Sequence, residues 1–124
     1  MKKILIIDDE EDFCFFLKQN LEAIGSFEVF TSPDGEQGLE LAKKIIPDLI
    51  LLDIMMPGMD GSDVAAELKR DRRTENIPAI FLTAIVKEME IKSSEGFIAG
   101  WHYIAKPVEI AKLLALINNL IPSS

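Results

Sequence analysis

The chain has 124 residues, of which 48% are hydrophobic; this suits one domain with a single core and excludes a disordered polypeptide. Its formal net charge of −8 at pH 7 argues against direct binding of nucleic acid or of an anionic membrane surface, since both need a basic footprint. The lone cysteine, Cys14, excludes an intrachain disulfide and fits a cytoplasmic location. No segment is long enough to span a bilayer, and the apolar run before Asp8 is too short for a signal peptide.

Short apolar runs alternate along the chain with segments of helical periodicity. The runs predict strands at 3–7, 27–31, 48–53, 78–83 and 102–105. Apolar residues spaced three or four apart predict helices over 13–24, 39–46, 64–68 and 110–120, with Cys14 on or near the buried side of the first. Strands that alternate with helices indicate a parallel sheet covered on both faces, so we expect an α/β domain. Over 86–100 we expect a short, irregular or mobile helix, because Ser93, Ser94 and Gly96 are poor helix formers.

Three acids follow strands whose carboxyl ends would meet at one edge of such a sheet. Asp8 and Asp9 follow the run 3–7, and Asp53 ends the run 48–53 before a loop with Pro and Gly. Open α/β sheets bind their ligands at this edge. Neighbouring strands lie about 4.8 Å apart, so the carboxylates could share one cation, and ligation by oxygen alone favours Mg²⁺ or Mn²⁺ over zinc. The alternative for Asp8 and Asp9 is helix capping, in which an acid satisfies free backbone N–H groups.

Two more polar residues end predicted strands at the same edge. Thr83 ends the fourth run, and Lys106 follows the fifth. Each could be ordinary by itself, Thr83 as a capping or strand-end hydroxyl and Lys106 as a solvated lysine. Together with the acids they form a set that can hold a phosphoryl group, because a metal and a lysine neutralise its oxygens and a hydroxyl donates a hydrogen bond.

Other chemistries lack their motifs. The chain has no G-x-x-x-x-G-K-[ST] loop of a P-loop NTPase and no G-x-G-x-x-G loop for a dinucleotide after its first strand. No Ser-His pair suggests acyl transfer, and we expect the single histidine, His102, at a strand end or on the surface.

Four motifs, by their order and spacing, resemble the receiver domain of bacterial two-component response regulators over nearly the whole chain. They are Ile6-Ile7-Asp8-Asp9-Glu10, Asp53-Ile54-Met55-Met56-Pro57-Gly58-Met59-Asp60-Gly61, Thr83-Ala84 and Tyr103-Ile104-Ala105-Lys106-Pro107. The resemblance implies a flavodoxin-like, doubly wound fold of five parallel strands in the order 2-1-3-4-5. It also implies a signalling switch rather than a turnover enzyme, with a sensor histidine kinase or a histidine phosphotransfer protein as donor.

The resemblance assigns roles to the acids. Asp53 would accept the phosphoryl group and become an aspartyl phosphate. Asp9 would ligate Mg²⁺ directly, and Asp8 would act largely through water. Asp53 and the backbone carbonyl of Met55 would complete the protein ligands.

The same resemblance assigns the switch to three further residues. Lys106, joined to Pro107 by a cis peptide bond, would pair with the phosphoryl group, and Thr83 would swing in to donate a hydrogen bond to it. Tyr103 would turn inward as Thr83 moves and alter the face made by the fourth helix, fifth strand and fifth helix, where a downstream protein would bind. Phosphorylation adds roughly two negative charges, which would bias an existing two-state equilibrium, in a monomer or in a phosphorylation-dependent dimer.

Two positions bear on the lifetime of the phosphoryl state, and one segment departs from the family pattern. In this family Met55 and Ile85 would flank the path of the hydrolytic water, and both are apolar here, which predicts a long-lived state. The run Gly100-Trp101-His102-Tyr103 is tighter than is usual in the family. This departure bears on the output face and not on the phosphorylation site.

No effector domain follows the last predicted helix, so we expect 1–124 to be a receiver domain whose output is protein binding. The alternatives are a fragment of a longer regulator with a DNA-binding or enzymatic output domain, a scaffold independent of phosphorylation, and a Mg²⁺-dependent phosphohydrolase of small molecules. Against the phosphohydrolase, Met55 stands two residues after Asp53, where a second acid would be needed.

Overall fold

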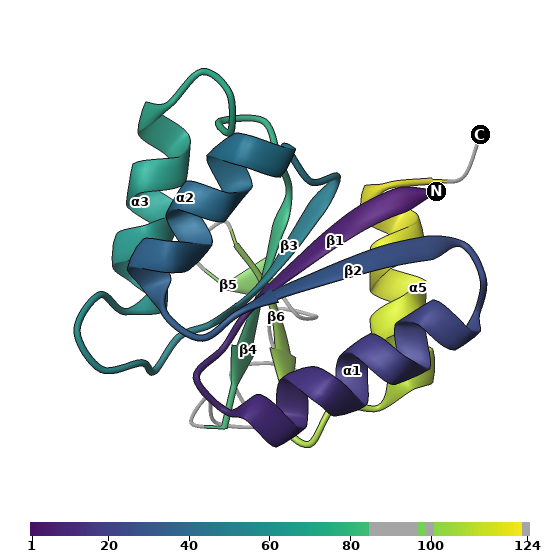
Figure 1. Ribbon diagram of the computed structural model, residues 1–124. Coiled ribbons are helices and arrows are strands. Elements are labelled where there is room, and N and C mark those ends of the chain that lie inside the picture. The colour runs from purple at the N-terminus through teal and green to yellow at the C-terminus, as the bar shows by residue number, and fades with distance from the viewer. Residues whose placement is uncertain (85–96, 99–100, 123–124) are drawn as a thin grey trace.

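The fold is a single parallel sheet with one short antiparallel strand added at its edge. The computed structural model describes residues 1–84, 97–98 and 101–122. The parallel strands are β1 (Lys2–Ile7), β2 (Phe27–Ser32), β3 (Leu49–Asp53), β4 (Ala79–Thr83) and β6 (Trp101–Ala105). The sheet order β2-β1-β3-β4-β6-β5 confirms the predicted order of the five parallel strands (Figure 1).

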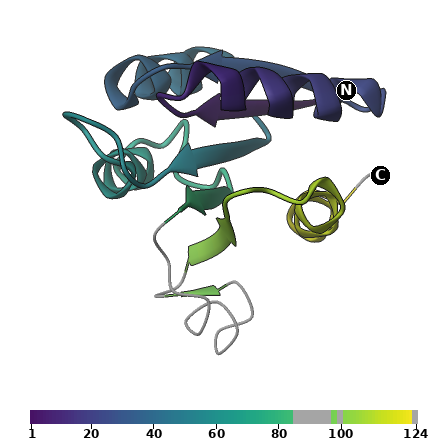
Figure 2. The same ribbon diagram turned by 90° about the horizontal axis from the view of Figure 1, so that it is seen from below.

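Helices cover both faces of the sheet, as predicted. The described helices are α1 (Glu11–Ala23), α2 (Gly35–Ile45), α3 (Gly61–Arg70) and α5 (Ile110–Leu120). Helices α1 and α5 lie on one face, and α2 and α3 lie on the other (Figures 1 and 2). None of these four helices has both the length and the apolar character needed to cross a membrane.

Side-chain caps explain why α2 and α3 begin before their apolar stripes. The carboxylate of Asp34 accepts a hydrogen bond from the N–H of Gln37 at 2.8 Å. Asp60 and Asp63 form a reciprocal capping box at the start of α3. The apolar stripes therefore predicted the buried faces of these helices but not their first turns.

The core has two layers because successive strand residues point to opposite faces of the sheet. On β1, Ile4 and Ile6 pack with apolar residues of α1 and α5, whereas Leu5 and Ile7 pack with those of α2 and α3. All four are fully buried, as expected of a central strand in a parallel sheet. Cys14 is also buried, in the layer under α1, which confirms its prediction as a core residue.

The edge strand β5 (Phe97–Ile98) differs from the sequence-based expectation. These two residues pair antiparallel with β6 instead of belonging to the helix predicted over 86–100. The rest of that prediction, 86–96 and 99–100, lies outside the described residues. Strand pairing depends on a partner, so the weak helix propensity of this segment did not reveal it. His102 lies within β6, paired with Ile80, and is half-buried.

Candidate functional site

The carboxyl ends of four parallel strands meet at one edge of the sheet. Asp8 follows β1, Asp53 ends β3, Thr83 ends β4 and Lys106 follows β6. The strands pair in a register that leaves these ends level, so residues far apart in sequence converge. The structure thus brings Asp8, Asp53 and Lys106 together and places Thr83 at the same edge, whereas Asp9, the other predicted acid, is exposed.

The ammonium group of Lys106 lies at the centre of this cluster. Its Nζ is 2.9 Å from Asp8 Oδ2, 2.9 Å from Glu10 Oε1 and 3.8 Å from Asp53 Oδ2. It also lies 4.4 Å from the centre of the Phe13 ring, a cation–π contact. The contacts with Asp8 and Glu10 are at hydrogen-bonding distance, and the contact with Asp53 is longer. Lys106 is therefore bound mainly by the segment that leads into α1.

The two oxygens of Asp8 have different surroundings. Oδ1 accepts a hydrogen bond from the N–H of Glu10 at 2.9 Å, which forms a turn before α1 and is not a cap of the helix, because Glu10 is itself the N-cap residue. Oδ2 is buried and faces Lys106 as an ion pair, but it has no aligned hydrogen bond to any described residue. A buried carboxylate oxygen is costly unless it is paired, and the ammonium of Lys106 supplies that charge at Oδ2.

Three carboxylates could hold a metal ion. Asp8, Glu10 and Asp53 each place one oxygen within 4.8 Å of the others. Oxygen-only donors, one of them the buried Oδ2 of Asp8, fit a small, hard divalent cation such as Mg²⁺. Asp9 is exposed and does not belong to this group of three.

Asp53 is buried, and its surroundings disfavour the ionised form of its carboxyl group. Burial raises its pKa to about 6, and the nearby charge of Asp8 contributes to the rise. The ammonium of Lys106 and the N–H of Met55, which donates to Asp53 Oδ1 at 3.2 Å, act in the opposite direction. Burial lowers the pKa of Lys106, but Glu10 and Asp8 together raise it to about 12, so Lys106 stays cationic. The carboxylates around Lys106 therefore carry more negative charge than its single ammonium group can neutralise.

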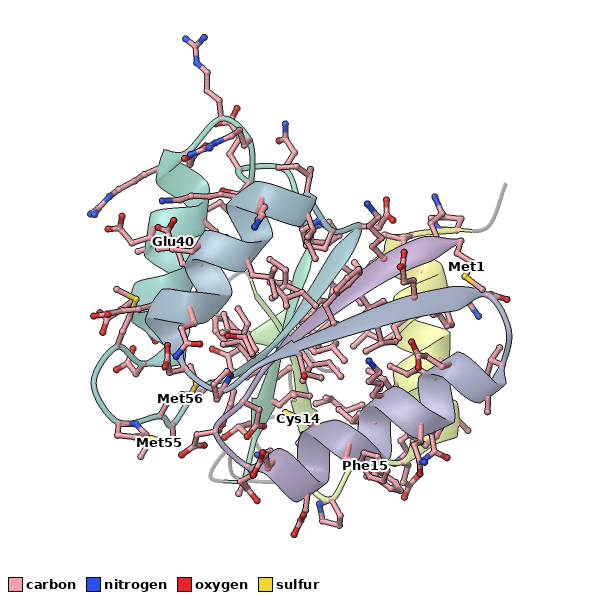
Figure 3. All side chains as sticks on the ribbon, viewed as in Figure 1. Met1, Cys14, Phe15, Glu40, Met55 and Met56 are labelled. Atoms are coloured by element: carbon pink, nitrogen blue, oxygen red, sulfur yellow. The ribbon has the colours of Figure 1, made fainter. Side chains whose placement is uncertain are left out.

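Backbone contacts position the remaining predicted residues. Thr83 is buried at the end of β4, and its carbonyl accepts a hydrogen bond from the backbone N–H of Lys106 at 2.9 Å. The bond between Lys106 and Pro107 is cis, as the resemblance implied. Tyr103 is half-buried, and its ring lies against Phe81 with centroids 5.2 Å apart. Figure 3 shows Met55 on the loop after β3, and its side chain is 59% exposed.

Some residues of the site were not predicted from the sequence. Glu10 appeared only as the last residue of the first family motif, and Phe13 only as the first residue of the helix predicted over 13–24. Gly61, at the start of α3, approaches β3 so closely that an added Cβ would collide with the carbonyl oxygen of Asp53. Its N–H also donates to the Ile54 carbonyl at 3.0 Å. A glycine just after the acidic loop was the one available signal for such a close approach.

Comparison with known proteins decides the family. Residues 4–118 match the response regulator receiver domain family. The chain belongs to this family. The receiver domain is 38% identical, over 98% of its length, to the DNA-binding dual master transcriptional regulator RpaA of Synechocystis sp., of which it covers 49%. It is 36% identical, over 95% of its length, to the response regulator PleD of Caulobacter vibrioides, of which it covers 26%. It thus spans about half or less of the length of these curated relatives.

Solved structures agree with this assignment. The receiver domain of sensor histidine kinase PA1611 from Pseudomonas aeruginosa PAO1 has a TM-score of 0.83 and 25% identity, with 98% of each chain covered. That structure has a magnesium ion coordinated in its active site cleft. A putative response regulator from Chloroflexus aurantiacus has a TM-score of 0.83 and 29% identity, again with 98% of each chain covered. The present chain is accordingly a receiver domain of two-component systems, and this domain family is one of signalling switches.

Proposed function

We propose that phosphorylation of Asp53 switches this receiver domain, with a phosphohistidine of a sensor histidine kinase or of a histidine phosphotransfer protein as donor. The observation that supports this most is the environment of the Asp53 carboxylate. It is buried, one oxygen accepts from the N–H of Met55, and the other faces the ammonium of Lys106. An oriented carboxylate next to a cation can act as a nucleophile whose anionic product is stabilised.

The transfer is a displacement at phosphorus. A carboxylate oxygen of Asp53 forms a bond to phosphorus while the N–P bond of the donor breaks. The electron pair of that bond stays with the donor imidazole, which takes a proton from solvent. Lys106 then neutralises the phosphoryl oxygens, and the Thr83 hydroxyl donates a hydrogen bond to them.

A divalent cation, Mg²⁺ with Mn²⁺ as a substitute, is proposed to be held by Asp8, Asp9, Asp53 and the carbonyl of Met55. When bound, it supplies positive charge that offsets the charge on the phosphoryl oxygens. Ligand oxygens of Asp8 and Asp53 lie within 4.8 Å of each other, which supports a cation between them, and the exposed Asp9 is the next residue after Asp8.

The output of the switch would be a change in protein binding. Rearrangement of Thr83 toward the phosphoryl group would allow Tyr103, now packed on Phe81, to turn inward. Tyr103 lies on β6, so its movement would alter the face near β6 and α5, while the fourth helix of the expected output face falls on residues outside those that the structure describes. A downstream protein would read this change as a shift between two existing states.

Mass spectrometry tests the acceptor directly. The domain is incubated with acetyl phosphate and Mg²⁺, and wild type is compared with Asp53→Asn. One phosphoryl group should be added to wild type and none to the variant, whereas Asp12→Asn, a change of an exposed acid nearby, should be phosphorylated like wild type. An adduct on Asp53→Asn, or none on wild type under any condition, would contradict the proposal.

The lifetime of the phosphoryl state is a separate proposal. Met55 is apolar and stands two residues after Asp53, where a polar side chain could orient an attacking water. Ile85, the second position, lies outside the described residues. We expect slow hydrolysis in acid-quench measurements, and decay within seconds would show that the apolar residue does not protect the acyl phosphate.

A further inference from the structure

Glu10 occupies the N-cap position of α1 but does not cap the helix. Its carboxylate forms no side-chain hydrogen bond to the backbone N–H groups of the first turn. The usual capping residues are Asn, Asp, Ser and Thr, and glutamate is not one of them. Glu10 Oε1 accepts a hydrogen bond from Lys106 Nζ at 2.9 Å, across 96 positions of sequence. The Glu10 carboxylate therefore contributes to the site and not to the start of α1.

The contact holds Lys106 on the α1 side of the cluster. Glu10 and Asp8 each lie 2.9 Å from Lys106 Nζ, while Asp53 Oδ2 lies 3.8 Å away. The Phe13 ring, also on α1, lies on the same ammonium. The Lys106 side chain is only 12% exposed, so few alternative conformations are open to it. The Glu10 side chain is 63% exposed and can move into solvent. Glu10 is thus the partner of Lys106 that can be released with least loss.

We propose that Glu10 is a positioning residue that retains Lys106 in the resting receiver domain and competes with the phosphoryl group for it. This inference rests on the proposed phosphorylation of Asp53. To pair with a phosphoryl group on Asp53, the ammonium must move from Glu10 toward Asp53. Glu10 therefore opposes the activated arrangement and favours the resting one.

The expected strength of this opposition is modest. Exposed ion pairs are worth little, because solvent screens them and both side chains lose freedom in forming them. Loss of the Glu10 carboxylate should therefore tighten the binding of a phosphoryl mimic by about two- to fivefold and no more. Such a change would adjust the threshold of the switch without abolishing either state.

A second role for Glu10 is the main competitor. Its oxygen also lies within 4.8 Å of ligand atoms of Asp8 and Asp53, so it could bind the metal directly. The two roles predict different effects when the Glu10 carboxylate is removed. A metal ligand would strengthen Mg²⁺ binding, whereas a partner of Lys106 would change mainly the binding of the phosphoryl mimic.

Calorimetric titration separates these roles in Glu10→Gln. Mg²⁺ is titrated first, and beryllofluoride, a phosphoryl mimic, is then titrated at saturating Mg²⁺. The matched control is Glu11→Gln, which removes the same charge at the next residue, also exposed, from an acid that has no described contact with Lys106. We expect Glu10→Gln to bind beryllofluoride about two- to fivefold more tightly than Glu11→Gln, with Mg²⁺ affinities that agree within about twofold.

Two results would overturn the inference. A loss of Mg²⁺ affinity of about tenfold or more in Glu10→Gln alone would make Glu10 a metal ligand. Equal beryllofluoride affinities in the two variants would show that only the general negative charge matters. Thermal unfolding of both variants checks that the fold is retained. Failure of wild type itself to bind beryllofluoride with Mg²⁺ would instead count against the proposed function.

Discussion

Asp53 and Asp71 are both aspartates next to a cation, yet their pKa values move in opposite directions. At Asp71, in the loop after α3, the guanidinium of Arg73 donates from Nε to Oδ1 at 3.0 Å and from Nη2 to Oδ2 at 2.8 Å. These hydrogen bonds, with one from the Arg73 backbone, hold the pKa of Asp71 well below its usual range. At Asp53, burial and the charge of Asp8 raise the pKa despite Lys106.

The two sites differ in the number of carboxylates that share the cation and in how deeply the carboxylates are buried. Arg73 serves one carboxylate, which is at the surface and fully hydrogen-bonded. Lys106 is shared by Asp8 and Glu10 at close range and by Asp53 at longer range. A balanced pair has no need of a ligand, whereas a buried excess of negative charge attracts one. The same two residue types thus form a structural pair in one region and a receptive site in the other.

Removal of the shared cation should have the largest effect. In Lys106→Ala, the rate of phosphorylation by acetyl phosphate should fall by about 100-fold, because the phosphoryl oxygens lose their ammonium partner. The free energy of unfolding should fall by about 2 to 3 kcal/mol, because the buried Asp8 is left without its ion pair. Stopped-flow kinetics and urea unfolding measure the two effects. Lys112→Ala, at an exposed pair with Glu109, is the control, and equal rates in both variants would refute the role of Lys106.

Crowding of the Asp53 backbone should have the next largest effect. Gly61→Ala places a Cβ against the Asp53 carbonyl oxygen, so α3 and β3 must separate. We expect a loss of about 2 kcal/mol in the free energy of unfolding, and weaker Mg²⁺ binding. This loss is expected even though alanine has a higher helix propensity than glycine. Ser62→Ala, at the next and exposed position, should be nearly neutral. A Gly61→Ala protein as stable as Ser62→Ala would show that the contact relaxes freely.

The raised pKa of Asp53 should appear as a pH dependence of stability. A folded-state pKa of about 6, above the unfolded value of 3.8, means that Asp53 stabilises the fold at low pH. This contribution is lost as the pH rises from about 4 through 6, by about 1 to 2 kcal/mol in the absence of Mg²⁺. Asp53→Asn lacks it, so the stability of the variant relative to wild type should increase over this interval. Urea unfolding at pH 4 and pH 7.5 measures the change, and parallel curves for the two proteins would contradict it.

The smallest effect is expected at the balanced pair. Asp71→Asn keeps one hydrogen-bond acceptor for Arg73 and removes a charge that solvent already screens. Its melting temperature should change less than that of Lys106→Ala or Gly61→Ala, and its phosphorylation rate should match wild type. Differential scanning calorimetry provides the measurement. A loss of stability as large as that of Lys106→Ala would mean that the difference in burial does not explain why the two ion pairs differ.

The sequence by itself determined the fold class and the strand-end residues, whereas the strand order was implied by the resemblance of its motifs to a known family. The apolar runs before Asp8, Asp53 and Thr83 have a local physical cause, since a parallel strand that is buried on both faces must be apolar until it ends. The loop with Pro and Gly after Asp53 and the cis bond before Pro107 were likewise carried by residue type and motif. The strand-end residues, the loop and the Lys106-Pro107 bond each depend on residues close together in the chain.

Only the tertiary structure decided which groups contact one another. Lys106 could have been paired with Asp53 from the sequence, but the register of β1, β3, β4 and β6 places it nearer Asp8 and Glu10. The pairing of β5 with β6 and the close approach of Gly61 to Asp53 also join segments that are separate in sequence. A contact between distant residues leaves no periodicity or spacing in either segment, because its geometry is set by packing of the whole sheet.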